Sequence, residues 1–137
     1  MIPQFKILII DDNAIDQIVT KQLLKKKLNL TSIEVVSSGK DALVWLTNYK
    51  REKNDFLILL LDIKMPEMDG FEFLEEFESL QNKRNFTNFM IVMLSSSLDP
   101  NDKKRAKNNT HVKTLLSKQL QVEDFAVLLP EKADEKK

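Results

Sequence analysis

The chain has 137 residues, of which 42% are hydrophobic and 31% charged, and 21 basic side chains balance 21 acidic ones. This composition is typical of one soluble globular domain, which we expect over residues 1–130, with residues 131–137 as a frayed tail. Balanced charge argues against nucleic acid or an anionic membrane as partner. The lack of cysteine excludes thiolate metal sites and cysteine nucleophiles. We find no signal peptide or membrane-spanning run and therefore expect a cytoplasmic protein.

Short runs rich in Ile, Leu, Val and Met alternate along the chain with segments of helical period. Runs of this kind are typical of strands that are buried on both faces. They predict five strands, over residues 5–10, 32–36, 56–61, 89–94 and, with a weaker pattern, 111–117.

The segments between these runs have apolar residues at helical spacing. In the first such segment, Ile15, Ile18, Val19 and Leu23 recur between Lys and Gln residues. Capping residues mark other helix starts, namely Asp69 and the pair Asp99-Pro100. The five predicted helices cover residues 14–28, 39–49, 69–80, a segment that begins at 99–100, and 121–129.

This alternation predicts an α/β protein with a parallel sheet between two layers of helices. Five strands favour the flavodoxin-like, doubly wound sheet of order 2-1-3-4-5, with five helices. Ligands of such sheets bind outside the carboxyl ends of the strands, where the strand order reverses. Here that point lies between the first and third strands.

Polar residues follow four of the five strands at this edge. Asp11 and Asp12 come after the first strand, Asp62 after the third, Ser95 after the fourth and Lys118 after the fifth. Three carboxylates that share a pocket repel each other, and Mg²⁺ with oxygen ligands would offset this repulsion. A carboxylate can also attack phosphorus, and Lys118 and Ser95 are of the types that neutralise phosphoryl oxygens.

Each of these residues also has an ordinary interpretation when it is taken alone. The acidic pair could cap the following helix, the serine could belong to a plain loop, and the lysine could be surface charge. His111 is the only histidine, and we expect it at a strand edge. Triad chemistry and transition-metal chemistry are therefore not expected.

Four segments resemble the receiver domain of two-component response regulators, and the resemblance spans about residues 5–130. They are "ILIIDDN", "LLLDIKMPEMDG", "IVMLSSS" and "LLSKQL". The resemblance implies that Asp62 is the phosphoacceptor, and that Ser95 and Lys118 contact the phosphoryl group. It also implies an Mg²⁺ cofactor with the protein ligands Asp11, Asp12, Asp62 and the backbone carbonyl of Lys64.

Two positions differ from the pattern of this family. Gln119 stands where relatives usually have a proline, often after a cis bond, which predicts a trans bond and a more mobile loop here. Leu115 stands where relatives have the aromatic residue that turns inward on activation. Coupling through an aromatic side chain is therefore not expected.

By this resemblance the chain is a single-domain response regulator in a phosphorelay. It would take a phosphoryl group from a histidine kinase or a histidine phosphotransfer protein, docking through its first and last helices. It would signal through a downstream protein or onward transfer, as a monomer or a phosphorylation-dependent homodimer, and catalyse only its own phosphorylation and dephosphorylation. The alternatives are a pseudo-receiver that binds without phosphorylation and a small aspartyl-phosphate phosphatase, although Lys64 replaces the second aspartate of such enzymes.

Overall fold

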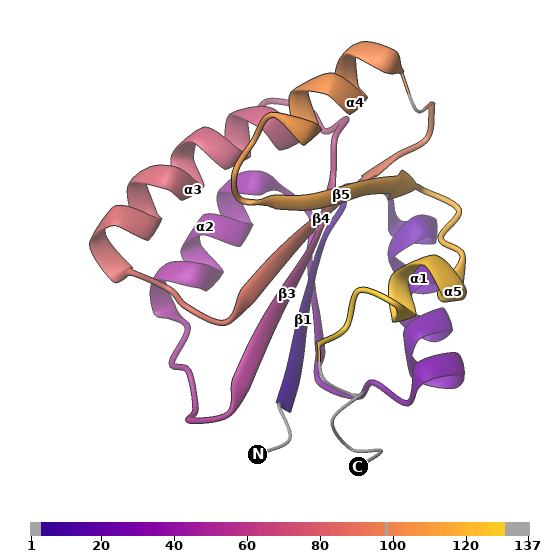
Figure 1. Cartoon of the computed structure of the whole chain (residues 1–137), viewed down its shortest axis with the longest axis horizontal. Coiled ribbons are helices and arrows are strands. Elements are labelled where there is room, and N and C mark those ends of the chain that lie inside the picture. The colour runs from indigo at the N-terminus through magenta and orange to yellow at the C-terminus, as the bar shows by residue number, and fades with distance from the viewer. Residues whose placement is uncertain (1–3, 98, 131–137) are drawn as a thin grey trace.

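The centre of the protein is an open parallel sheet of five strands, seen in a computed structural model that describes residues 4–97 and 99–130 (Figure 1). The tail predicted at 131–137 lies outside these residues. The strands are β1 (Gln4–Ile10), β2 (Ile33–Val36), β3 (Asp55–Asp62), β4 (Phe89–Ser95) and β5 (Val112–Ser117). Their order is β2-β1-β3-β4-β5, which confirms the predicted fold.

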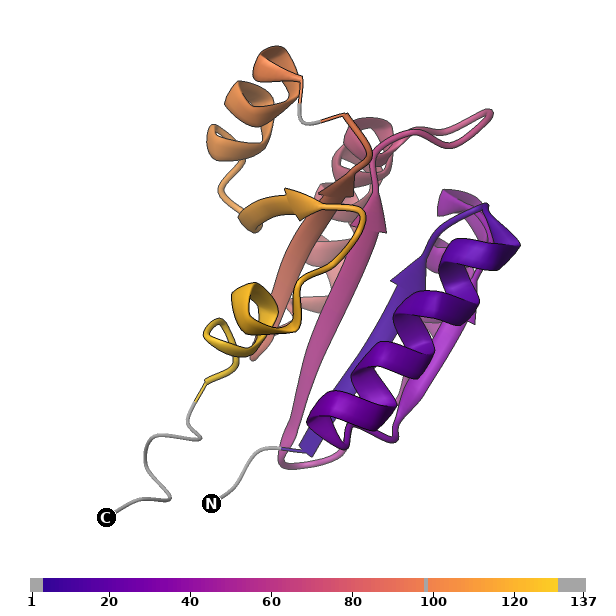
Figure 2. The ribbon, with the colours of Figure 1, turned by 90° about the vertical axis from the view of Figure 1, so that its right-hand side faces the viewer.

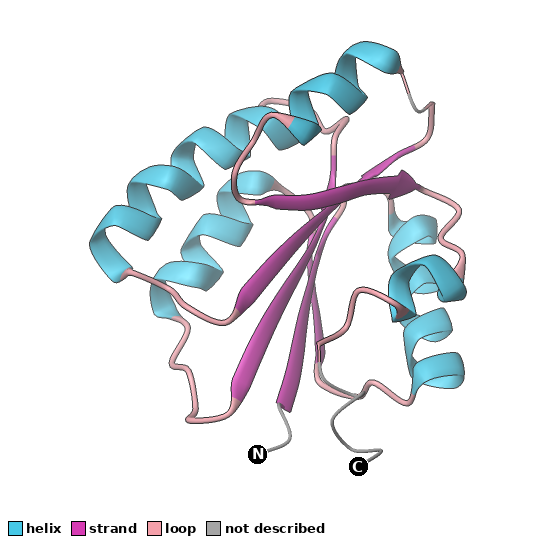
Figure 3. Cartoon of the chain, in the orientation of Figure 1, coloured by secondary structure: helices cyan, strands magenta, loops and turns pink. Residues whose placement is uncertain are grey.

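Five helices cover the two faces of this sheet (Figure 3). They are α1 (Ala14–Leu28), α2 (Gly39–Asn48), α3 (Gly70–Arg84), α4 (Pro100–Lys107) and α5 (Val122–Ala126). Phe73 and Phe77 lie in the core under α2, α3 and α4, whereas Leu24 and Phe125 lie in the core under α1 and α5. Figure 2 shows the face with α1 and α5. In the described ranges, no helix combines the length and apolar character needed to cross a membrane.

Capping residues set the ends of α3. The Asp69 side chain accepts a hydrogen bond from the N–H of Glu72, whose side chain accepts one from the N–H of Asp69. The predicted start is therefore correct. The predicted end at Leu80 is too early, because the helix continues to Arg84 and Asn85 then takes a left-handed conformation with φ of 52°.

The last helix is shorter than the predicted 121–129, since α5 ends at Ala126. Beyond it, the N–H groups of Leu128 and Leu129 bond to carbonyls three residues back, so the chain tightens into turns. Pro130 disfavours the helical conformation of Leu129, so a helix could not extend past this point in any case.

Of the apolar stripe that identified α1, only Leu23 packs partly against the core. Ile15, Ile18 and Val19 are 71%, 62% and 58% exposed. The buried residues of this helix are Thr20 and Leu24. The period correctly predicted a helix, but the stripe is left as an exposed apolar surface.

Candidate functional site

Asp11 and Asp62 lie next to each other at the carboxyl ends of the two central strands. β1 and β3 pair in register up to Ile10 and Leu61, so the residues that follow are neighbours. Both aspartates are only 2% exposed, whereas Asp12 is exposed. One carboxylate oxygen from each of the three lies within 4.8 Å of the others. The structure thus brings together the three carboxylates that the sequence placed in one site.

Lys118 reaches this cluster from the end of β5. Its Nζ lies 3.3 Å from Asp11 Oδ1 and 3.1 Å from Asp62 Oδ2, and its side chain is 15% exposed. Its backbone N–H donates to the carbonyl of Ser95 at 2.8 Å. Ser95 ends β4, is buried, and its hydroxyl accepts a hydrogen bond from the N–H of Ser97. The predicted serine and lysine therefore share one edge with the aspartates.

The surroundings of Asp62 make its ionised form less favourable in the metal-free protein than it is in water. Burial is the largest effect and, with the charge of Asp11, raises the pKa of Asp62 to about 6. Hydrogen bonds from Lys118 and from the N–H of Lys64 act in the opposite direction. The positive charge of Lys118 therefore does not fully offset the effects of burial and of Asp11 on the Asp62 carboxylate.

Lys118 also contacts the carboxylate of Asp16, which lies outside the cluster of three aspartates and which the sequence analysis missed. Asp16 Oδ2, in the first turn of α1, lies 2.8 Å from Lys118 Nζ. Burial lowers the pKa of the Lys118 ammonium, but the hydrogen bonds to Asp16 and Asp62 outweigh this and raise it above its ordinary value. An acidic residue in a first helical turn is usually explained by the helix dipole, so the sequence offered no signal for this contact.

The donor set fits a hard divalent cation. Asp11, Asp12 and Asp62 present carboxylate oxygens to one point, and Lys118 provides one positive charge against them. Mg²⁺ prefers such oxygen ligands and retains several waters, which the exposed side of the cluster can accommodate. Lys64 is exposed and its N–H bonds to Asp62 Oδ1 at 3.3 Å.

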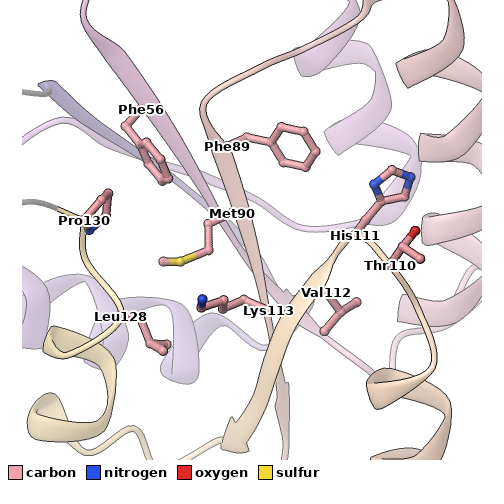
Figure 4. A pocket seen from close by; sticks show the side chains of 9 residues that line it. All are labelled: Phe56, Phe89, Met90, Thr110, His111, Val112, Lys113, Leu128 and Pro130. Atoms are coloured by element: carbon pink, nitrogen blue, oxygen red, sulfur yellow. The ribbon is translucent and has the colours of Figure 1, made fainter.

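A separate pocket lies toward the other end of the sheet, around the start of β5 (Figure 4). None of the acidic-site residues lines it. His111 lines this pocket from the turn directly before β5, so the strand predicted at 111–117 begins one residue later, at Val112. Its Nε2 lies 2.5 Å from Glu78 Oε1, and its ring lies against Phe77 and Phe89. His111 is therefore part of a contact between α3 and β5.

These features define a flavodoxin-like α/β protein with an acidic, lysine-containing site at the switch point of its sheet. The model of the response regulator receiver domain family matches residues 7–129. The chain belongs to this family, whose members act in two-component signalling.

Relatives and solved structures agree with this assignment. A response regulator receiver protein from Dyadobacter fermentans is 29% identical, with a TM-score of 0.82 over 91% of this chain and 94% of that one. Probable histidine kinase 4 of Oryza sativa is 40% identical over 79 residues, which are 58% of this chain and 7% of the rice protein. The chain thus spans a small part of that relative.

A further similar structure contains a partner. It is the receiver domain of the Saccharomyces cerevisiae response regulator Ssk1, crystallised with the histidine phosphotransfer protein Ypd1. It is 19% identical to this chain, with a TM-score of 0.71 over 92% of this chain and 86% of that one. At this identity the likeness establishes the fold alone.

Proposed function

We propose that Asp62 accepts a phosphoryl group from a histidine kinase or histidine phosphotransfer protein in an Mg²⁺-dependent reaction. The observation that carries this proposal is the position of the Asp62 carboxylate, which is buried at the end of β3 and shares the Lys118 ammonium with Asp11. A rigid strand therefore presents one nucleophilic oxygen to a site that can balance phosphoryl charge.

In this reaction an Asp62 carboxylate oxygen forms a bond to phosphorus while the bond from phosphorus to the donor's leaving atom breaks. Lys118 and Ser95 would donate hydrogen bonds to the phosphoryl oxygens. Bound Mg²⁺ would neutralise developing charge, and its protein ligands would be Asp11, Asp12, Asp62 and the Lys64 carbonyl. The product is an aspartyl phosphate.

The first test is the mass of the intact protein after incubation with acetyl phosphate and Mg²⁺. We expect a gain of one phosphoryl group, absent in Asp62→Asn and after chelation of the metal. Asp55→Asn is the matched control, because Asp55 is an equally buried aspartate at the other end of β3. A gain that persists in Asp62→Asn would refute the assignment, and no gain in the wild type would favour a phosphorylation-independent binding module.

We also infer that the phosphodonor protein docks on α1. Ile15, Ile18 and Val19 form an exposed apolar stripe, and a cleft lined by Val19, Leu23 and Lys118 continues from it to the acidic site. A protein on this stripe would hold its phosphohistidine close to Asp62. Membership of the response regulator receiver domain family supports the choice of partner class.

Ile18→Asp is expected to slow phosphoryl transfer from a histidine phosphotransfer protein at least tenfold, because a charge replaces apolar contact area at the centre of the stripe. Transfer from acetyl phosphate should be unchanged, since this donor needs no docking surface. The control is Val44→Asp, which places the same charge at an exposed valine of α2. Equal slowing by both variants would place the docking surface elsewhere.

Output would follow through a downstream protein, onward transfer or a homodimer that uses α4, β5 and α5. β5 is an edge strand of the sheet and none of its residues is fully buried, so this face can change its contacts. Leu115 of β5 packs partly buried against the core. A change on this face would therefore involve strand and helix shifts, without an aromatic side chain at this position.

A further inference from the structure

Lys118 makes three ionic contacts, and they match the three N–H donors of its ammonium group. The acceptors are Asp16 Oδ2 at 2.8 Å, Asp62 Oδ2 at 3.1 Å and Asp11 Oδ1 at 3.3 Å. The shortest contact is thus the one to α1, and the other two are to residues at the ends of strands. Any further acceptor can reach the ammonium only by replacing one of these oxygens.

The three carboxylates are not equivalent in the proposed reaction, on which this inference rests. Asp11 and Asp62 belong to the cluster whose oxygens converge within 4.8 Å, together with Asp12. Both would change partners when a cation and a phosphoryl group enter. In the part of the chain that the structure describes, Asp16 is not a member of that cluster. Its contact is therefore the one that Lys118 can keep.

Lys118 needs such an anchor because a lysine side chain is long and has high rotamer entropy. Its backbone is fixed by the N–H bond to the Ser95 carbonyl, but the loop continues into the exposed Gln119. Asp16 sits on α1, a helix of 15 residues, and its own N–H is bound by the Asn13 side chain at 2.9 Å. The anchor is therefore part of a rigid element.

We propose that Asp16 is a positioning residue for phosphoryl transfer. It holds the Lys118 ammonium at the rim of the acidic site while Asp11 and Asp62 exchange their contacts with this ammonium for the incoming groups. Lys118 then needs little reorganisation to donate to a phosphoryl oxygen. Asp16 itself contacts neither phosphoryl group nor cation in this scheme.

The test compares rates of phosphorylation by acetyl phosphate with Mg²⁺ in a double-mutant cycle. Asp16→Asn is expected to lower the rate about tenfold, because the ammonium loses its fixed partner. In the Lys118→Ala background, Asp16→Asn should cause no further loss, because it acts through the lysine. Asp16→Glu should recover part of the rate, since its carboxylate can still reach the ammonium.

Asp41→Asn is the matched control, because Asp41 holds the same position after the N-cap of α2 as Asp16 does in α1. Both substitutions remove one favourable charge from a helix N-terminus, but only Asp16 contacts Lys118. Equal rates for the Asp16→Asn and Asp41→Asn variants would overturn the proposal. The proposal would also fail if Asp16→Asn lowered the phosphorylation rate by the same factor in the wild type and in the Lys118→Ala background. If the wild type is not phosphorylated at all, the proposed function itself is refuted, and this result can be distinguished from the two outcomes above.

Discussion

Without divalent cations, Asp62→Asn is expected to be more stable than the wild type by about 2 kcal/mol at pH 8. Burial and the charge of Asp11 raise the pKa of Asp62 from 3.8 to about 6, so its ionised form is unfavourable in the folded protein. A rise of this size corresponds to about 3 kcal/mol at a pH well above both values. Asparagine removes the charge but remains a buried polar group, so we expect a smaller net gain.

The stability that Asp62→Asn gains over the wild type should increase with pH. Between about pH 4 and pH 6 the folded protein retains a proton on Asp62 that the unfolded chain has lost. The stability contribution of this group is therefore complete below pH 4 and disappears as the pH rises through 6. The advantage of Asp62→Asn should be absent near pH 4 and fully developed above pH 7.

Urea unfolding followed by circular dichroism at several pH values, with a chelator present, measures this difference. Asp41→Asn, at an exposed aspartate, serves as control and should not be more stable than the wild type at pH 8. Adding Mg²⁺ should stabilise the wild type more than Asp62→Asn, because the variant lacks one proposed ligand. If the wild type with chelator present is more stable than Asp62→Asn at pH 8, this account is contradicted.

The strand order and the convergence of Asp11, Asp62, Ser95 and Lys118 could be predicted from the sequence. In a doubly wound parallel sheet, the residue after each apolar run must lie at one edge, whatever the details of packing. The register of β1 with β3 then makes Asp11 and Asp62 neighbours. Order along the chain was therefore enough to define the main part of the site.

The exposed stripe of α1 and the contact of Asp16 could not be predicted in this way. A helical period identifies a helix but not which face packs on the sheet, and here Thr20 and Leu24 are buried instead of Ile15 and Ile18. Asp16 occupies a position where the helix dipole already favours an acidic residue. Its ion pair depends on how closely the end of β5 approaches α1, which is a property of tertiary packing.

Gly70→Ala is expected to destabilise the protein by about 3 kcal/mol and to slow phosphorylation of Asp62. Neither this glycine nor Gly39 has a positive φ, so the requirement is for space. A Cβ at position 70 would lie 2.8 Å from the Asp62 carbonyl oxygen and 3.0 Å from Ile63 Cα. Backbone atoms of a central strand cannot move aside cheaply, and overpacking of this kind costs about 1–3 kcal/mol or more.

Gly39→Ala is the matched control, because Gly39 and Gly70 are the only two glycines and each begins a helix. A Cβ at position 39 would meet Met68 Sδ at 2.7 Å, and this flexible side chain can turn away. Denaturant unfolding should therefore show a large loss only for Gly70→Ala. The added methyl group of Gly70→Ala pushes on the end of β3. Phosphorylation of Asp62 should therefore also be slower in this variant when it is fully folded, in the absence of urea. Equal stabilities for the two variants would contradict the predicted backbone clash at position 70.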